Sequence, residues 1–296
     1  MSGGILVALD GSAAAEAALP YAQVLARAQR RRLLLVRAVG VVGGEEADRA
    51  ALHAAETYQA AVVGRLMTGM AVEGVTFVGQ PKDAILAEAR LRRVGLIAMT
   101  VDARRPARSA LGGPTTQAVL AGADVPTLFV PVISDAMPTS LPLQSRCILI
   151  PLDGSKLAEA ALPIGLSLAS ALGVGVLLLY SVAPPSERPS DAIGRCLPLG
   201  ATEGGAYLAA QQARLGRQEP GVPVTITVQQ GSPGEQIVRA ASEHHALLVT
   251  MAMHGSSGKQ GALLGSVAAN VLQQAVVPQL LVRPHAAEAR PAAHVA

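Results

Sequence analysis

The sequence is poor in aromatic residues and in cysteine. Among 296 residues it has no tryptophan, two phenylalanines and four tyrosines. Because proteins hold single-stranded nucleic acid largely by stacking bases on aromatic rings, this scarcity argues against such a partner. The two cysteines, Cys147 and Cys196, lie far apart and match no metal-binding or redox spacing. We therefore expect no nucleic-acid partner, no metal site and a reduced, cytoplasmic compartment.

Concentrated charge and an unbroken apolar run are lacking as well. The formal net charge is only +3, and we interpret the two short arginine runs, at 30–32 and 104–105, as solvated helix ends. Residues 160–186 carry no charge and are long enough to span a bilayer. Pro163 and Gly173 interrupt this segment, so we predict soluble core and no membrane partner. Half of the residues are hydrophobic, which suffices for cores built from Ala, Leu and Val.

What the sequence does contain is a long internal repeat. Residues 8–20 align with residues 151–163, and residues 79–81 align with residues 231–233. The offset between the copies rises from 143 to 152 between these two matches. We place the nine additional residues in segment 184–200, which is rich in Pro, Gly and Ser. A repeat of this length predicts two complete domains rather than a solenoid of short units.

The expected domain boundaries follow from this repeat. The first domain should cover residues 1–133 and the second residues 146–284. Between them, residues 134–145 contain two prolines and are predicted to form an extended linker. The alanine-rich tail, residues 285–296, is predicted to be disordered.

Each copy alternates apolar runs with helical patterns. The strands are predicted at Ile5–Leu9, Leu33–Val39, Val72–Val78, Leu96–Thr100 and Thr127–Val130, then at Cys147–Leu152, Val176–Val182, Val224–Gln229, Leu247–Met251 and Gln279–Val282. The helices are predicted at Ala13–Gln29, Glu45–Thr68, Pro81–Arg92 and Thr115–Ala121, then at Lys156–Ala171, Thr202–Gly216, Pro233–His244 and Val267–Gln274. Pro20 and Pro163 fall inside the first helix of each copy and should kink it. The alternation predicts α/β domains with parallel sheets covered on both faces.

An Asp-Gly-Ser triplet ends the first strand of each copy. In an open α/β sheet, ligands bind beyond the carboxyl ends of the strands, so Asp153 is a candidate to accept a hydrogen bond from a base or a ribose. The alternative is that Asp153 or Ser155 caps the following helix. The triplet at Asp10 has the same two interpretations. A phosphoacceptor site of the receiver type is excluded because no further acidic residues lie beside the first strand.

The glycine-rich segment 251–267 follows a buried strand and precedes a helix. Such a loop lets backbone N–H groups approach an anion, and the helix dipole adds favourable potential. Its spacing, Ala252-x2-Gly255-x9-Gly265-Ser266, is neither that of the dinucleotide-binding fingerprint nor that of the Walker loop. The segment is therefore either a phosphate-binding loop or a plain crossover loop.

Together, the strand-end triplet, the Gly231-Ser-Pro233 segment and this loop resemble the universal stress protein (UspA-type) family. The resemblance covers Ile5–Val130 and Cys147–Val282, as in the tandem members of that family. It implies two flavodoxin-like (HUP-type) domains, each with an open five-stranded parallel sheet in the order 3-2-1-4-5.

Family members that bind ATP carry Gly-x2-Gly-x9-Gly-Ser/Thr in this loop. By resemblance, Gly255 and Gly265 would let the chain wrap the phosphates, while Ser266 and the N–H of Val267 would bind phosphate oxygens. Asp153 would face the adenine, and the backbone around Val182 would hold its edge.

Two further residues of the loop belong to the candidate site. His254 is a candidate phosphate contact or a solvated loop histidine. Ala252 stands where the family has its first glycine, and this departure matters only if the position needs a positive φ or a contact that no methyl group tolerates.

The first copy departs further from the family pattern. Ala103 replaces the middle glycine and Pro114 replaces the serine, which removes a hydroxyl and an N–H group. We therefore predict that the second domain binds ATP together with Mg²⁺ and that the first domain does not.

The resemblance implies a stress-response sensor that binds ATP or another adenine nucleotide. It also implies fifth strands that pair across domains or subunits, so a homodimer is expected. No serine has a histidine placed beside it by the sequence, so we expect no catalytic residues and at most slow ATP hydrolysis. Two alternatives stay open, a nucleotide-free interaction scaffold and an adenine-nucleotide hydrolase.

Overall fold

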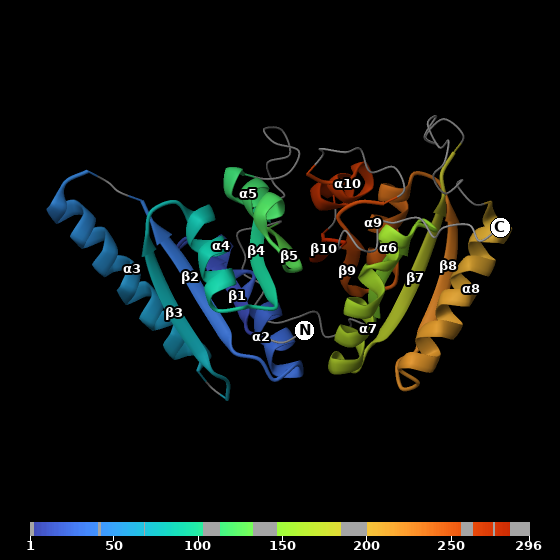
Figure 1. Ribbon diagram of the computed structural model, residues 1–296, viewed down its shortest axis with the longest axis horizontal. Helices are drawn as coiled ribbons and strands as arrows, with labels where there is room; N and C mark the ends of the chain where they lie inside the picture. Colours follow the sequence, from blue (N-terminus) through green and yellow to red (C-terminus); the bar gives the residue numbers. More distant parts are fainter. Residues whose placement is uncertain are drawn as a thin grey trace, which may run out of the picture. The chain divides into compact units, whose positions relative to one another are not determined.

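The computed structural model describes residues 3–40, 43–67, 69–102, 113–132, 147–184, 200–255, 263–274 and 276–284. The chain divides into two compact units, Met1–Leu143 and Gln144–Ala296, each of which is described by itself (Figure 1). The expected linker, most of the inserted segment and the tail lie outside the described residues.

Each unit contains a parallel sheet built from the described strands. In the first unit these are β1 Ile5–Leu9, β2 Leu33–Val39, β3 Val72–Val78, β4 Leu96–Asp102 and β5 Thr127–Val132, in the order β3-β2-β1-β4-β5. In the second unit they are β6 Cys147–Leu152, β7 Gly175–Val182, β8 Val224–Gln230, β9 Ala246–Ala252 and β10 Gln279–Val282, in the order β8-β7-β6-β9-β10. Both orders are 3-2-1-4-5 within their unit, which confirms the predicted fold class.

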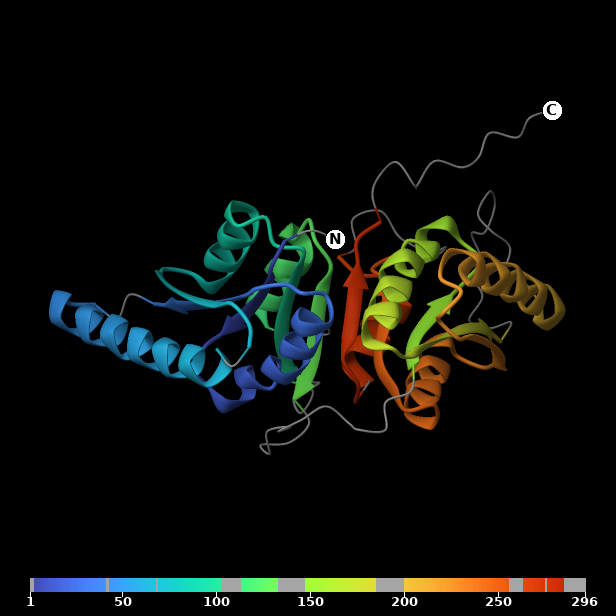
Figure 2. The ribbon, with the colours of Figure 1, turned by 90° about the horizontal axis from the view of Figure 1, so that it is seen from below.

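The helices lie on both faces of each sheet. They are α1 Ala13–Glu16, α2 Leu19–Ala28, α3 Glu45–Leu66, α4 Pro81–Leu91 and α5 Pro114–Gly122, then α6 Lys156–Glu159, α7 Ala161–Leu172, α8 Ala201–Gln218, α9 Pro233–Glu243 and α10 Ser266–Gln274. Figure 2 shows α2 and α3 on one face of the first sheet and α4 on the other. In the second unit α7 and α8 share one face and α9 lies on the opposite one.

The central strands are buried on both faces, as the apolar runs predicted. In β9 every residue is buried, and β1 and β6 are buried at all but one position each. Leu, Ile, Val and Ala side chains make up nearly all of this core, and Phe129 is the largest fully buried side chain. In the described part of the chain, no helix combines the length and apolarity that crossing a membrane requires.

The single helix predicted after each first strand is wrong, because the structure has two shorter helices there. The first segment ends at Glu16 in one unit and at Glu159 in the other. Pro20 and Pro163 lie four residues further along and have no N–H to bond the carbonyls of Glu16 and Glu159. The prolines therefore divide each helix instead of kinking it.

Candidate functional site

The Asp-Gly-Ser turn after β6 is held by its own hydrogen bonds. Both the backbone N–H and the hydroxyl of Ser155 donate to Oδ1 of Asp153, at 2.9 Å and 2.6 Å. Ser155 Oγ in turn accepts from the N–H of Ala158 at 3.2 Å and caps α6. Gly154 has φ +84°, a conformation that glycine adopts without steric penalty. The capping interpretation is thus confirmed for Ser155, while one oxygen of Asp153 fixes the turn.

The other oxygen of Asp153 faces the end of the neighbouring strand. β6 and β9 are adjacent in the sheet, so their carboxyl ends bring Asp153 next to Gly255. A Cβ on Gly255 would overlap Oδ2 of Asp153. The glycine is therefore required by space, because any side chain would displace the carboxylate or the loop. This junction lies at the carboxyl ends of the strands where the strand order reverses, the usual ligand position in such sheets.

The loop between β9 and α10 closes on itself at Gly265. The N–H of Gly265 donates to the carbonyl of Met253 at 2.7 Å, and the Gly265 carbonyl accepts from the N–H of Ala269 at 2.9 Å. The first bond joins the two ends of the loop, and the second starts helix α10. A Cβ on Gly265 would lie 3.2 Å from the Met253 carbonyl and 3.5 Å from the Cα of His254. Gly265 therefore permits a close approach of two backbone segments.

Residues 256–262, the middle of this loop, lie outside the described residues. Just beyond Gly265, Ser266 and Val267 form the first turn of α10, where backbone N–H groups have no partner within the helix. Ser266 is exposed, and Val267 and His254 are half-buried. The sequence-predicted residues at the two ends of the loop are thus brought together with Asp153 and Gly255.

Ala252 is the last residue of β9 and pairs with Val282 of β10. It is buried, and its backbone is not in the left-handed region. The same holds for the backbones of Gly255 and Gly265. Nothing in the backbone conformation therefore requires glycine at position 252.

Val182, predicted to hold an adenine edge, lies at the end of β7. Its carbonyl accepts from the N–H of Gly231 at 3.1 Å, beside its partner Gln230 in β8. In a parallel strand the N–H and C=O of one residue point toward the same neighbour, and those of the next residue point the other way. The Val182 backbone is therefore directed at β8, and the neighbouring residues Ser181 and Ala183 are directed toward β6.

The first unit repeats the turn but not the start of the last helix. Ser12 donates its N–H to Asp10 Oδ1 at 2.8 Å and caps α1, as in the second unit. Helix α5, however, begins with Pro114 after Gly113, so its first position has neither hydroxyl nor N–H. Asp102, which corresponds to His254, adds a carboxylate at the end of β4. Ala103, Arg104 and Arg105 lie outside the described residues.

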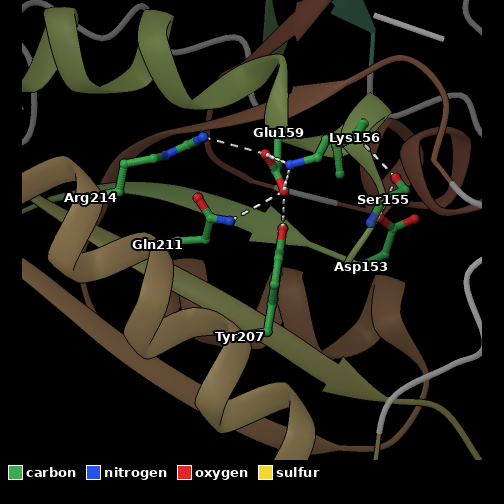
Figure 3. A network of polar contacts seen from close by, with 8 residues as sticks. Asp153, Ser155, Lys156, Glu159, Tyr207, Gln211 and Arg214 are labelled. Carbon is green, nitrogen blue, oxygen red and sulfur yellow. Dashed lines mark hydrogen bonds and ion pairs between the residues drawn. The ribbon is translucent and has the colours of Figure 1, made fainter. Parts of the chain in front are cut away.

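A polar network beside the Asp153 turn was not anticipated from the sequence (Figure 3). Its centre is the buried carboxylate of Glu159, which is 8% exposed. Tyr207 and Gln211 of α8 donate to it at 3.3 Å and 3.2 Å, and Lys156 lies at 2.9 Å. Arg214 completes the network at 3.5 Å. Burial, followed by the negative charge of Glu159, raises the pKa of Tyr207 well above its usual range.

The same arrangement recurs in the first unit, where Tyr58 and Arg65 bind Glu16 at 2.9 Å and 2.7 Å. These contacts link the first helix of each unit to its long helix. Because both units have them, the network is not specific to the unit that carries the glycine-rich loop. A Tyr-x6-Arg spacing in both long helices, with a glutamate in the aligned segment after each Asp-Gly-Ser, was the available sequence signal.

Cys147 and His244 have structural surroundings. Cys147 is buried, its thiol lies 3.7 Å from the carbonyl of His244, and burial raises the pKa of that thiol. His244 is the C-cap residue of α9. Over the described ranges no three His, Cys, Asp or Glu side chains are grouped to hold a metal ion. Cys196 lies outside those ranges.

Comparison with known proteins gives one consistent family. The profile of the universal stress protein family matches residues 1–131 and again residues 145–283. A universal stress protein of Mycobacterium tuberculosis strain H37Rv is 29% identical over 212 residues, which is 70% of this chain and 64% of the relative. One from Mycolicibacterium smegmatis is 32% identical over 143 residues, 46% of this chain and 45% of the relative. The match thus spans about half to two thirds of these relatives' length.

Among solved structures, a universal stress protein from Archaeoglobus fulgidus superposes with a TM-score of 0.71. The match covers 95% of this chain and 98% of that one at 18% identity, which supports the fold alone. These comparisons confirm the family resemblance drawn from the strand-end triplet and the glycine-rich loop.

Proposed function

Since the chain belongs to the universal stress protein family, we propose that its second unit binds ATP, or another adenine nucleotide, beyond the carboxyl ends of β6 and β9. Asp153, with Ser181 and Ala183 beside Val182, would hold the nucleoside, and the ends of the β9–α10 loop would hold the phosphates. The protein would act as a stress-response regulator whose surface changes with nucleotide occupancy.

One observation carries this proposal, the bond from the Gly265 N–H to the Met253 carbonyl at 2.7 Å. It closes the loop so that α10 begins beside Gly255 and Asp153. The hydroxyl of Ser266 and the first N–H groups of α10 then lie at the same end of the sheet as Asp153. Phosphate binds well at such a helix start because N–H groups and the helix dipole both favour negative charge.

The small residues at this site also support the proposal. Gly255 and Gly265 have no Cβ, so the loop backbone can lie close to Asp153 and to the Met253 carbonyl. Ala252 lies within β9, so its methyl group does not alter the loop backbone. In the first unit, Pro114 and Asp102 instead remove a donor and add a negative charge, which supports binding by the second unit only.

The test is a calorimetric titration of the full-length protein with ATP and Mg²⁺. Ser266→Pro copies the first residue of α5, and proline is well accepted at a helix's first position, so the variant should fold. Losing a hydrogen bond to a charged phosphate should weaken binding by about tenfold to a hundredfold. The matched control, Pro114→Ser, should leave the affinity unchanged.

Three outcomes separate the alternatives. Absence of binding at millimolar ATP, ADP and AMP would favour the nucleotide-free scaffold. Binding that survives Ser266→Pro but fails in a variant of the first unit would reverse the assignment of the units. Release of product at more than a trace rate would favour the hydrolase. We expect at most slow hydrolysis, because no general base or catalytic metal site has been assigned. The homodimer expected from the family is a separate prediction, tested by sedimentation velocity.

A further inference from the structure

The amino end of the first sheet gathers arginines that are distant in sequence. Arg30, Arg31 and Arg32 link α2 to β2, and Arg92 and Arg93 follow α4. We call these five the arginine surface. Arg30, Arg32 and Arg93 are exposed, and Arg31 and Arg92 are half-buried.

Contacts around β1 show that the two segments are neighbours. The two residues that precede β1 lie between these segments, because Gly4 lies against Arg32 and Gly3 lies against the carbonyl of Arg93. Glu73 of β3 joins them from the side, at 2.8 Å from Arg92 and 4.0 Å from Arg32.

Positive charge outweighs negative charge in this surface. Arg92 also lies 3.4 Å from Glu88, so it forms ion pairs with both Glu73 and Glu88. Arg30, Arg32, Arg92 and Arg93 face these two carboxylates, so among these groups positive charge exceeds negative charge by two. Within the described residues, no carboxylate forms an ion pair with Arg30 or Arg93.

The second unit provides an internal comparison. The residues equivalent to the arginine surface there are Gly173, Val174, Gly175, His244 and His245. Helices α7 and α9 end in the same way as α2 and α4 but without arginine. Helix termination and the helix dipole therefore do not by themselves require arginine at these places.

Two of the arginines occupy a backbone conformation that favours glycine. Arg30 has φ +52° and Arg93 has φ +48°, each just after the end of a helix. Gly173, the equivalent of Arg30, has φ +67° and needs no side chain there. A left-handed non-glycine residue destabilises the fold, and such residues concentrate where function requires them. Arg30 is thus placed where the second unit has glycine, whereas at the position of Arg93 both units have a non-glycine residue with positive φ, since His245 has φ +49°.

We propose that the arginine surface binds an acidic segment of a partner protein. Glu73 already lies between two of its guanidinium groups, which shows that the spacing suits carboxylates. Leu91, which is 71% exposed between Arg90 and Arg92, offers an apolar anchor that a protein segment can use and a nucleic acid cannot. A protein that holds duplex DNA through about six to ten phosphate contacts needs more positive charges than this surface provides.

The test is a fluorescence anisotropy titration of the full-length protein with a labelled peptide, Glu-Glu-Leu-Glu-Glu-Leu-Glu-Glu. Binding should weaken as salt is added and should be absent for the same peptide with Gln in place of Glu. The double variant Arg30→Gly and Arg93→Gly should lower the affinity by about fivefold to tenfold. It should also raise the melting temperature by about 2–4 °C, because glycine relieves both positive-φ positions.

The matched control is His245→Gly, which makes the same backbone change at φ +49° in the second unit. It should stabilise the protein without affecting peptide binding. An unchanged affinity in the double variant would show that the peptide does not bind at the arginine surface. Tighter binding to a short DNA duplex, or to phosphatidylcholine–phosphatidylserine vesicles, than to the peptide would overturn the proposed class of partner.

Discussion

Replacing Gly255 with alanine directly tests how the candidate site is assembled. The added methyl group would overlap Oδ2 of Asp153, whose other oxygen is held by two bonds from Ser155, at 2.9 Å and 2.6 Å. The carboxylate therefore cannot turn away without breaking those bonds. Overpacking of this kind typically lowers the free energy of unfolding by about 1–3 kcal/mol. We expect Gly255→Ala to fall in that range and to weaken ATP binding.

A double-mutant cycle with Asp153→Ala isolates the contact. Asp153→Ala alone removes the acceptor for Ser155 and should destabilise by about 1–2 kcal/mol. In the double variant the carboxylate is gone and the methyl group has room. The combined loss should then be smaller than the sum of the single losses by about 1 kcal/mol or more.

Urea denaturation monitored by circular dichroism measures these differences in the free energy of unfolding. Hydrogen exchange assigns them to the second unit. Gly216→Ala is the control, because a Cβ at this position of α8 meets nothing within 4 Å. In a helix that change should be neutral or stabilising by up to about 1 kcal/mol. A Gly255→Ala variant as stable as the wild type, or strictly additive losses in the cycle, would show that Asp153 and Gly255 are not in contact.

Two further outcomes are expected. Gly204→Ala should destabilise by about 1–3 kcal/mol, because its Cβ would lie 2.6 Å from the ring of Tyr180, whereas Gly205→Ala, with only one atom at 4.0 Å, should not. Equal melting temperatures for these two neighbours would contradict the packing of α8 on β7. Burial and a nearby carboxylate raise the pKa of Tyr58 and Tyr207 above the usual 10.0. The folded state therefore keeps these protons longer than the unfolded state, so stability should hold below pH 10 and fall above it. Replacing both tyrosines with phenylalanine should flatten that decline in alkaline urea titrations.

The amino-acid sequence by itself determined the doubled α/β organisation of this chain. Hydrophobic runs and turn residues act over a few positions, so strand and helix locations follow from local pattern. The aligned copies exposed the repeat, and the strand-end triplet with the glycine-rich loop pointed to the family and hence to the strand order. The loss of the serine at Pro114 was also visible in the sequence, since a single residue type decides it.

Only the tertiary structure decided which of these residues meet. Asp153 and Gly255 are neighbours because β6 and β9 are adjacent in the sheet, a relation that no local pattern encodes. The arginine run 30–32 was interpreted as a solvated helix end, yet Arg32 shares Glu73 with Arg92, which is distant in sequence. Proximity across a sheet depends on strand order and register, and these are set by packing of the whole unit rather than by neighbours along the chain.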